Sequence, residues 1–236
     1  MLSPHDDTEE LHIQLMKRTP FEILTWVHET FDPGEVTMAT GFGAEGVCLI
    51  DMLTKINNRI PILYLDTDVL FQETYQLRIK LQDRYGIRFV RIASSLSLDR
   101  QAVQYGDRLW ERDPDLCCTL RKTDPLKEAL RPFDAWITGI RRDQSSARKN
   151  AKVIERDGRY GLLKVNPLLG WSREEVWSYI REHRLPYNPL YDKGYSSIGC
   201  IHCTTPVSAG EDERAGRWRG FQKTECGLHN RTLPSR

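Results

Sequence analysis

The chain has 236 residues, of which 39% are hydrophobic and 28% charged, and its formal net charge is +1. These values are ordinary for a globular protein and leave room for one large α/β domain or two small ones. A net charge so near zero creates no overall field that would attract nucleic acid or an anionic membrane. Any anion site must therefore be a local cluster of basic side chains.

The amino-terminal segment is acidic and polar, and it lacks the basic start and apolar middle of a signal peptide. No apolar run approaches the roughly 18–20 residues that span a bilayer. We therefore predict a cytoplasmic protein with neither a membrane nor a nucleic acid as partner. In a reducing cytosol clustered cysteines more often bind metal or take part in chemistry than form disulfides, which makes the six cysteines informative.

Short apolar runs alternate with segments of helical periodicity along the first two thirds of the chain. Buried strands are predicted over residues 36–40, 60–65, 87–92 and 135–138. Helices are predicted after the first two strands, one with Val47, Ile50 and Leu53 on its buried face and one over 70–85. This alternation predicts βαβ units, and hence an α/β fold with a mainly parallel sheet.

Three loops follow predicted strands, at Gly41, Asp66 and Gly139, and the carboxyl ends of parallel strands are where such sheets bind ligands. A later helix is predicted to begin at Ser172, which forms a capping box with Glu175. Residues 208–236 show little apolar periodicity. We predict a single domain over 1–207, followed by a flexible carboxyl-terminal tail over 208–236.

Four of the cysteines form two close pairs, the adjacent Cys117 and Cys118 and the Cys-x-x-Cys of Cys200 and Cys203. Four thiolates suit either zinc or an iron–sulfur cluster. Neighbouring side chains diverge on a helix, so both reach one zinc ion with difficulty, whereas the separate iron corners of a cubane accept them more easily. The pattern favours a [4Fe–4S] cluster, with zinc as the first alternative and unmetallated thiols or disulfides as the second.

The remaining two cysteines differ in their setting. Cys48 lies in the middle of an apolar helical segment and is predicted to be a small buried hydrophobic side chain. Cys226 lies ten residues from the end of the chain, too exposed to belong to a core. Lys223 and His229 flank it, and both could lower the pKa of its thiol. By position alone it would be an incidental surface thiol.

Three motifs together resemble the assimilatory adenylyl-sulfate reductases of the iron–sulfur type, which belong to the family of PAPS/APS (phosphoadenylyl-sulfate and adenylyl-sulfate) reductases. They are CCxxRK at 117–122, IGCxxC at 198–203 and ECGLH at 225–229. Supporting stretches are GFGAEG at 41–46, LDTDVLFQETY at 65–75, GIRRDQS at 139–145, YNPLYDKGY at 187–195 and RAGRW at 214–218. The resemblance covers residues 37–229 and implies a Rossmann-like adenine-nucleotide α-hydrolase fold.

The resemblance also implies an activity, the reduction of adenylyl sulfate to sulfite and AMP in sulfate assimilation and cysteine biosynthesis. Cys226 would attack the substrate's sulfur and carry it as S-sulfocysteine, and thioredoxin or a similar dithiol would then release sulfite. The tail that carries Cys226 could close over the substrate and then open to the dithiol. The four paired cysteines would hold the cluster, and a homo-oligomer is expected.

The substrate carries sulfate and phosphate charge, so cations and N–H donors should converge on it. In the resemblance Lys122 would lie between the cluster and the substrate, and the turn at 41–45 and the LDTD stretch at 65–68 would receive the nucleotide. The residues assigned to the substrate are Lys122, Arg148, Arg214, Arg217, His229, Gly43, Thr67 and Gly139. For Arg142, Lys149 and Lys152 a solvated surface charge is the favoured interpretation.

The nucleotide end departs from the family pattern. Gly41 stands where relatives carry Ser, Gln72 where they carry Pro, and Asp68 where they carry Gly, which adds a negative charge near the expected nucleotide edge. The first alternative is therefore a reductase of phosphoadenylyl sulfate, or of both nucleotides. The others are a related ATP pyrophosphatase, against which the ECGLH tail argues, and a zinc-binding or iron–sulfur regulatory module, in which Cys226 would be dispensable.

Overall fold

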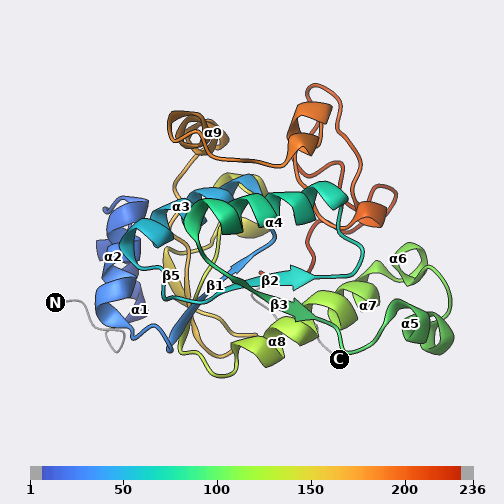
Figure 1. The fold of residues 1–236 in the computed structure, drawn as a ribbon, viewed down its shortest axis with the longest axis horizontal. Helices are drawn as coiled ribbons and strands as arrows, with labels where there is room; N and C mark the ends of the chain where they lie inside the picture. Colours follow the sequence, from blue (N-terminus) through green and yellow to red (C-terminus); the bar gives the residue numbers. More distant parts are fainter. Residues whose placement is uncertain (1–6, 230–236) are drawn as a thin grey trace.

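The structure is a computed structural model that describes residues 7–229, and a six-stranded sheet forms its centre (Figure 1). The strand order is β3-β2-β1-β4-β6-β5. The strands are β1 (Val36–Thr40), β2 (Ile62–Asp66), β3 (Phe89–Ala93), β4 (Ala135–Ile137), β5 (Ile154–Arg156) and β6 (Leu163–Val165). All pairings are parallel except that of β5 with β6. The predicted mainly parallel α/β sheet is confirmed.

The strand predictions differ from the structure mainly at the edge of the sheet. β1 has the predicted bounds, and β2, β3 and β4 differ from theirs by at most two residues at either end. The strands β5 and β6 were not predicted. Each has three residues, which is too few for an alternating pattern to stand out from its surroundings.

Helices flank both faces of the sheet, with α3, α4 and α9 on one side and α8 on the other (Figure 1). The α-helices are α1 (Thr8–Leu15), α2 (Pro20–Thr30), α3 (Ala44–Ile56), α4 (Gln72–Tyr85), α5 (Leu98–Tyr105), α6 (Leu109–Arg112), α7 (Pro114–Cys118), α8 (Asp124–Leu130) and α9 (Arg173–Glu182). A π-helical turn, η1 (Thr119–Thr123), joins α7 to α8. The short 3₁₀ turns are η2 (Arg142–Gln144), η3 (Ser146–Arg148), η4 (Pro189–Lys193) and η5 (Ile201–Cys203).

The later helix begins where the sequence predicts. Ser172 is its N-cap, and its hydroxyl accepts from the backbone N–H of Glu175 while the Glu175 carboxylate accepts from that of Ser172. This exchange satisfies two N–H groups that the first turn of a helix cannot pair internally. Within residues 7–229, no helix has the length and apolar character that a membrane span requires.

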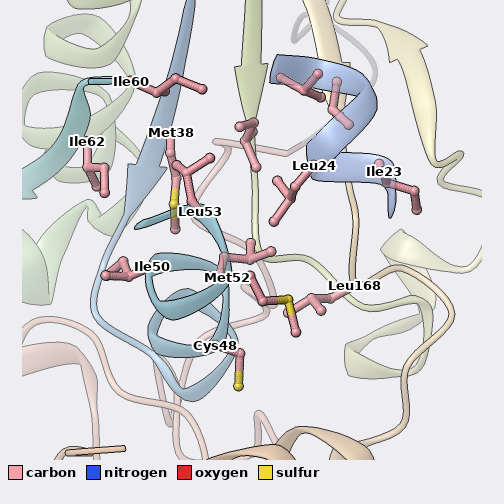
Figure 2. Packing of buried hydrophobic residues seen from close by; sticks show 14 of the residues in the cluster. Ile23, Leu24, Met38, Cys48, Ile50, Met52, Leu53, Ile60, Ile62 and Leu168 are labelled. Atoms are coloured by element: carbon pink, nitrogen blue, oxygen red, sulfur yellow. The ribbon is translucent and has the colours of Figure 1, made fainter. Parts of the chain in front are cut away.

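The main hydrophobic core lies between the sheet and the helices of the first face (Figure 2). Met38 of β1 and Ile62 of β2 point into it, as expected for alternate residues on strands with one face toward these helices. Leu53 of α3 and Leu24 of α2 pack there too, and Cys48 is fully buried among them. The prediction that Cys48 is a small core side chain is confirmed.

A second, smaller cluster covers the opposite face. Leu63 of β2 and Trp136 of β4 are buried strand residues of this cluster, and Leu126 and Leu130 of α8 belong to it as well. Leu228, from the carboxyl-terminal segment, packs against the same cluster. The segment around Leu228 is thus brought back to the sheet, where it borders the cavity at the carboxyl ends of the central strands.

The carboxyl-terminal segment, residues 208–229, has neither helix nor strand but lies against the domain. Thr204 and Arg217 form an isolated antiparallel bridge, and the Trp218 N–H donates to the Cys203 carbonyl at 3.1 Å. Trp218 is buried. Residues 230–236 of the predicted tail lie outside the described residues, and the flexibility of the tail stays a prediction.

Candidate active site and cysteine cavity

A cavity of about 220 Å³ opens at the carboxyl ends of β1, β2 and β4. Its walls include the loop that follows each of these strands, together with η1 and the carboxyl-terminal segment. All nine residues that the sequence assigns to substrate or catalysis line this single cavity. They are Gly43, Thr67, Lys122, Gly139, Arg148, Arg214, Arg217, Cys226 and His229.

The glycine-rich turn is shaped by close contacts. Gly43 is the N-cap of α3, and the next backbone N–H, that of Ala44, donates to the Tyr191 hydroxyl at 3.1 Å. A Cβ on Gly139 would lie 3.2 Å from the Glu45 Cβ and 3.4 Å from the Gly46 nitrogen. Gly139 therefore lets the end of β4 approach the first turn of α3, which keeps the two loops on one cavity.

The loop after β2 turns its acidic side chains away from the cavity. Thr67 lines the cavity, but Asp68 has a positive φ of 59° and pairs with Arg91 and with Arg121, the latter at 3.0 Å. Asp66 accepts from Arg91 and from the Tyr75 hydroxyl, each at 2.7 Å. Two guanidinium groups thus offset the negative charge that Asp68 adds, and its place at the nucleotide edge stays a prediction.

The two cysteine pairs meet at a second, small cavity beside the first. Cys117 and Cys118 end α7, where the wide η1 turn begins, while Cys200 is the N-cap of η5 and Cys203 is its last residue. All four line this cavity together with Lys122. Among residues 7–229, no group of three or more His, Cys, Asp or Glu side chains is arranged so that it could hold a metal ion. The thiols as they stand form a cavity wall and do not converge on one point.

Lys122 links the two cavities, because it lines both. Burial alone would lower the pKa of its ammonium, but the thiolates of Cys200, Cys118 and Cys226 outweigh burial and raise it. Burial likewise raises the pKa of Cys117 to about 12 and that of Cys118 to about 11. The pKa of Cys200 is lowered instead. Burial would raise it, but Lys122 and the Thr67 hydroxyl, 3.2 Å from the Cys200 sulfur, outweigh that effect.

Arg121 is a site residue that the sequence analysis missed. It is 1% exposed and donates to Gln101 at 2.8 Å, to the Thr67 carbonyl at 3.1 Å and to Asp68. These bonds tie η1, the loop after β2 and α5 together beneath the cysteine cavity. Its position directly before Lys122 in the CCxxRK motif was the available signal.

The two arginines Arg148 and Arg214 share one carboxylate, that of Glu225. Arg148 donates to it through Nε at 2.9 Å and Nη2 at 3.0 Å, and Arg214 through Nη2 at 3.2 Å. Burial by itself would raise the pKa of the Glu225 carboxyl, but Arg148, followed by Arg214, holds it below its usual range. Glu225, like Arg121, was not among the predicted site residues.

The surroundings of Cys226 correct one expectation. His229 stacks on Trp136 with ring centroids 5.8 Å apart. Burial, and then the charges of Lys164 and of nearby arginines, hold the pKa of His229 well below its usual range. A lowered pKa favours the neutral imidazole at pH 7, so His229 is a neutral and not a cationic neighbour of Cys226. Lys223, the other flanking basic residue, pairs with Asp115.

Comparison with known proteins gives relatives over nearly the whole chain. The model of the phosphoadenosine phosphosulfate reductase domain matches residues 35–206. A protein of Halalkalibacterium halodurans named adenosine 5'-phosphosulfate reductase is 47% identical over 221 residues, which are 93% of this chain and 95% of that one. Adenosine 5'-phosphosulfate reductase 2 of Bacillus subtilis is also 47% identical, over 209 residues and 88% of each chain.

Solved structures agree with these sequence relatives. The crystal structure of phosphoadenylyl-sulfate reductase from Candida auris, in a phosphate complex, superposes with a TM-score of 0.75 at 32% identity. The match covers 88% of this chain and 99% of that one. An FMN adenylyltransferase of Candida glabrata in complex with ATP, 16% identical with a TM-score of 0.58 over 95% of this chain and 78% of its own, shares the fold alone.

Proposed function

The chain belongs to the phosphoadenosine phosphosulfate reductase family, and on that premise we propose that it reduces adenylyl sulfate to sulfite and AMP through Cys226. The observation that carries the proposal is the single cavity in which Cys226 meets four basic side chains at the carboxyl edge of the sheet. A doubly charged, anhydride-like substrate needs such a set of cations, and a thiol among them is suited to nucleophilic attack. The relatives that are 47% identical are named for this nucleotide.

The first chemical step is attack of the Cys226 thiolate on the substrate's sulfur. An S–S bond forms, the bond from sulfur to the bridging phosphate oxygen breaks, and AMP leaves with its electron pair. The product on the enzyme is an S-sulfocysteine. Lys122 and Arg217 line the cavity with Cys226 and would offset the charge on the departing phosphate and on the sulfate oxygens.

The second step needs a dithiol, for which thioredoxin is the expected donor. One thiolate of the dithiol attacks the sulfur of Cys226, and sulfite leaves with the electron pair of the S–S bond. The second thiol of the dithiol then resolves the mixed disulfide and restores the Cys226 thiol. The dithiol loses two electrons and the sulfur of the substrate gains them, so the cycle balances without another reductant.

The four paired cysteines are proposed to hold a [4Fe–4S] cluster. Four buried or half-buried thiols around one cavity fit a multi-iron group better than a single zinc ion, which needs its ligands to meet at one point. A bound cluster would supply a fixed charge distribution beside Lys122. Two residues of the chain connect this cavity to the substrate cavity. Lys122 borders both, and Arg121 donates to the Thr67 carbonyl and so holds the loop after β2.

Phosphoadenylyl sulfate is the alternative substrate, because the 32% identical structure from Candida auris is a reductase of that nucleotide. The higher identity to the bacterial proteins favours adenylyl sulfate. A cytoplasmic location and self-association stay predictions from the sequence.

The test is an assay under anaerobic conditions with both nucleotides side by side. The purified protein, with thioredoxin and a thioredoxin-reducing system, should release sulfite from adenylyl sulfate with the higher kcat/KM. Iron and acid-labile sulfide should be present in the wild type and lost in Cys203→Ser, along with turnover. A protein that contains zinc and releases no sulfite from either nucleotide would contradict the proposal, and normal turnover by cluster-free Cys203→Ser would contradict the role of the cluster.

A further inference from the structure

The residue directly before the proposed nucleophile is a buried acid. Glu225 is 7% exposed, although it lies in a segment without helix or strand. Its carboxylate accepts four short bonds, two from Arg148, one from Arg214 at 3.2 Å and one from the Ser145 hydroxyl at 2.8 Å. A buried carboxylate with a bidentate arginine is among the stronger polar contacts in proteins.

The backbone next to Glu225 is held by the same arginine. Arg214 donates through Nε at 3.2 Å and Nη2 at 3.0 Å to the carbonyl of Thr224. On the other side of Cys226, Leu228 packs on the second hydrophobic cluster and His229 stacks on Trp136. Cys226 therefore lies between an ionic anchor and an apolar anchor. Both anchors border the substrate cavity, because Arg148 and Arg214 line it and so do Leu228 and His229.

The four cations of the cavity are not equivalent. Arg148 and Arg214 are both paired with Glu225. Lys122 and Arg217 have no carboxylate partner in the part of the chain that the structure describes, and they line the same cavity. Arg217 donates to the Cys203 carbonyl at 3.3 Å and lies over the Trp218 ring. Within the described residues, two of the four cations thus have a carboxylate partner and two do not.

We propose that Glu225 is a positioning residue whose ion pairs with Arg148 and Arg214 close the carboxyl-terminal segment and set Cys226 over the substrate cavity. The role of Cys226 rests on the proposed function, but the closing contact does not. The pair is suited to a reversible closure. A charged side chain loses its partners but regains water when the segment opens, whereas an apolar anchor would leave a hydrophobic surface exposed.

The substrate-free protein gives a direct test, because closure must slow the reaction of Cys226 with an alkylating reagent. The full-length protein, purified without oxygen, is treated with iodoacetamide at several pH values. Modification of Cys226 is then followed by mass spectrometry of the tryptic peptide over 224–231. The limiting rate at high pH, where the thiol is fully ionised, reports how often the segment opens and no longer depends on the thiol's pKa.

Glu225→Gln and Arg148→Gln should each raise this limiting rate at least about tenfold, because each change breaks the buried two-point contact between Arg148 and Glu225. The double variant should stay within about twofold of Glu225→Gln, since both changes open the same contact. Glu211→Gln is the matched control. Glu211 pairs with Arg219 on the surface of the same segment, and its loss should leave the rate unchanged.

The two single variants also separate closure from simple electrostatics. Glu225→Gln removes a negative charge near Cys226 and Arg148→Gln removes a positive one, so an effect through the thiol's pKa alone would move the two pH profiles in opposite directions. Limiting rates that do not rise in either variant, or that rise additively in the double variant, would overturn the proposal. Far-ultraviolet circular dichroism checks that each variant is folded.

Turnover provides the second readout. With adenylyl sulfate, Glu225→Gln should lower kcat about tenfold or more and leave KM within about threefold, because the nucleophile is misplaced while the substrate's contacts remain. An equal rise in KM with unchanged kcat would instead make Glu225 part of substrate binding and overturn the positioning role. If the wild type reduces neither nucleotide, the proposed function fails, yet the alkylation rates still decide whether Glu225 closes the segment.

Discussion

The Arg148–Arg214 side and the Lys122–Arg217 side of the cavity contain the same number of cations but differ in what those cations contact. On the first side Glu225 offsets one of the two positive charges, and the two arginines hold the pKa of its carboxyl below the usual range. On the second side the charge faces thiols, and those thiols raise the pKa of Lys122. The difference teaches that lining a cavity does not identify a substrate ligand. The partners of each cation decide which role it can have.

The largest effect is expected at Cys226, which lines the same cavity as the four cations. Cys226→Ser should abolish sulfite release, since a serine hydroxyl is a far weaker nucleophile and its sulfate ester could not be cleaved by a dithiol. The iron content should be unchanged, because Cys226 lies outside the cysteine cavity. Cys48→Ala, in the main core, is the matched control and should keep its activity. Retained turnover in Cys226→Ser would mean that Cys226 is not the nucleophile, and the cations would then have no common reacting group to be compared around.

The second prediction compares the two sides directly. Lys122→Gln should lower kcat/KM for adenylyl sulfate by about 10²–10³, the usual cost of losing one charge-assisted contact to a transition state. Arg148→Gln should lower kcat and leave KM nearly unchanged, because Arg148 acts through Glu225. Steady-state kinetics at equal iron content measures both, and Lys127→Gln on the exposed face of α8 is the control. If kcat and KM change in the same way in both variants, Lys122 and Arg148 do not differ in role and the comparison of the two sides fails.

The third prediction concerns Asp68, at the edge of the Lys122 side. Since Arg91 and Arg121 neutralise it, Asp68→Asn should change the ratio of kcat/KM between adenylyl sulfate and phosphoadenylyl sulfate by less than about threefold. Loss of the Arg121 contact should instead loosen the loop under the cysteine cavity, and iron should be lost faster in air. A tenfold change in this ratio of kcat/KM values would instead mean that Asp68 lies close to the bound nucleotide.

Much of this site is visible in the sequence because its residues are unusual where they stand. Two pairs of cysteines point to a shared site even though more than one kind of group could occupy it, and β1 is a clear apolar run with the predicted bounds. Glu225 and Arg121 are different, since an isolated acid or base in a sequence is normally a solvated surface charge. Only the fold shows that an arginine some 77 residues earlier, Arg148, buries Glu225.

The sequence alone does not give the charge of one group, His229. His229 next to a catalytic cysteine suggests a cation, because the unperturbed imidazole titrates near neutral pH. Its environment comes from β4 and β6, which place Trp136 against the ring and the ammonium of Lys164 close by. Neither strand position can be related to His229 without the sheet register. The sequence therefore lacks information on long-range packing. For the same reason it does not show that Arg148 is the partner of Glu225.

The smallest expected effect tests that neutral histidine through the pH dependence of stability. The pKa of His229 is lowered in the folded protein. Below about pH 6.5 the imidazole is therefore protonated in the unfolded chain but stays neutral in the folded one. Stability should thus fall as the pH drops, by about 1 kcal/mol between pH 7.5 and 5.5 from this residue. His229→Asn should lack that contribution, and urea unfolding at several pH values measures the difference. An equal pH dependence in both proteins would mean that His229 titrates normally and is protonated in the folded protein below about pH 6.5.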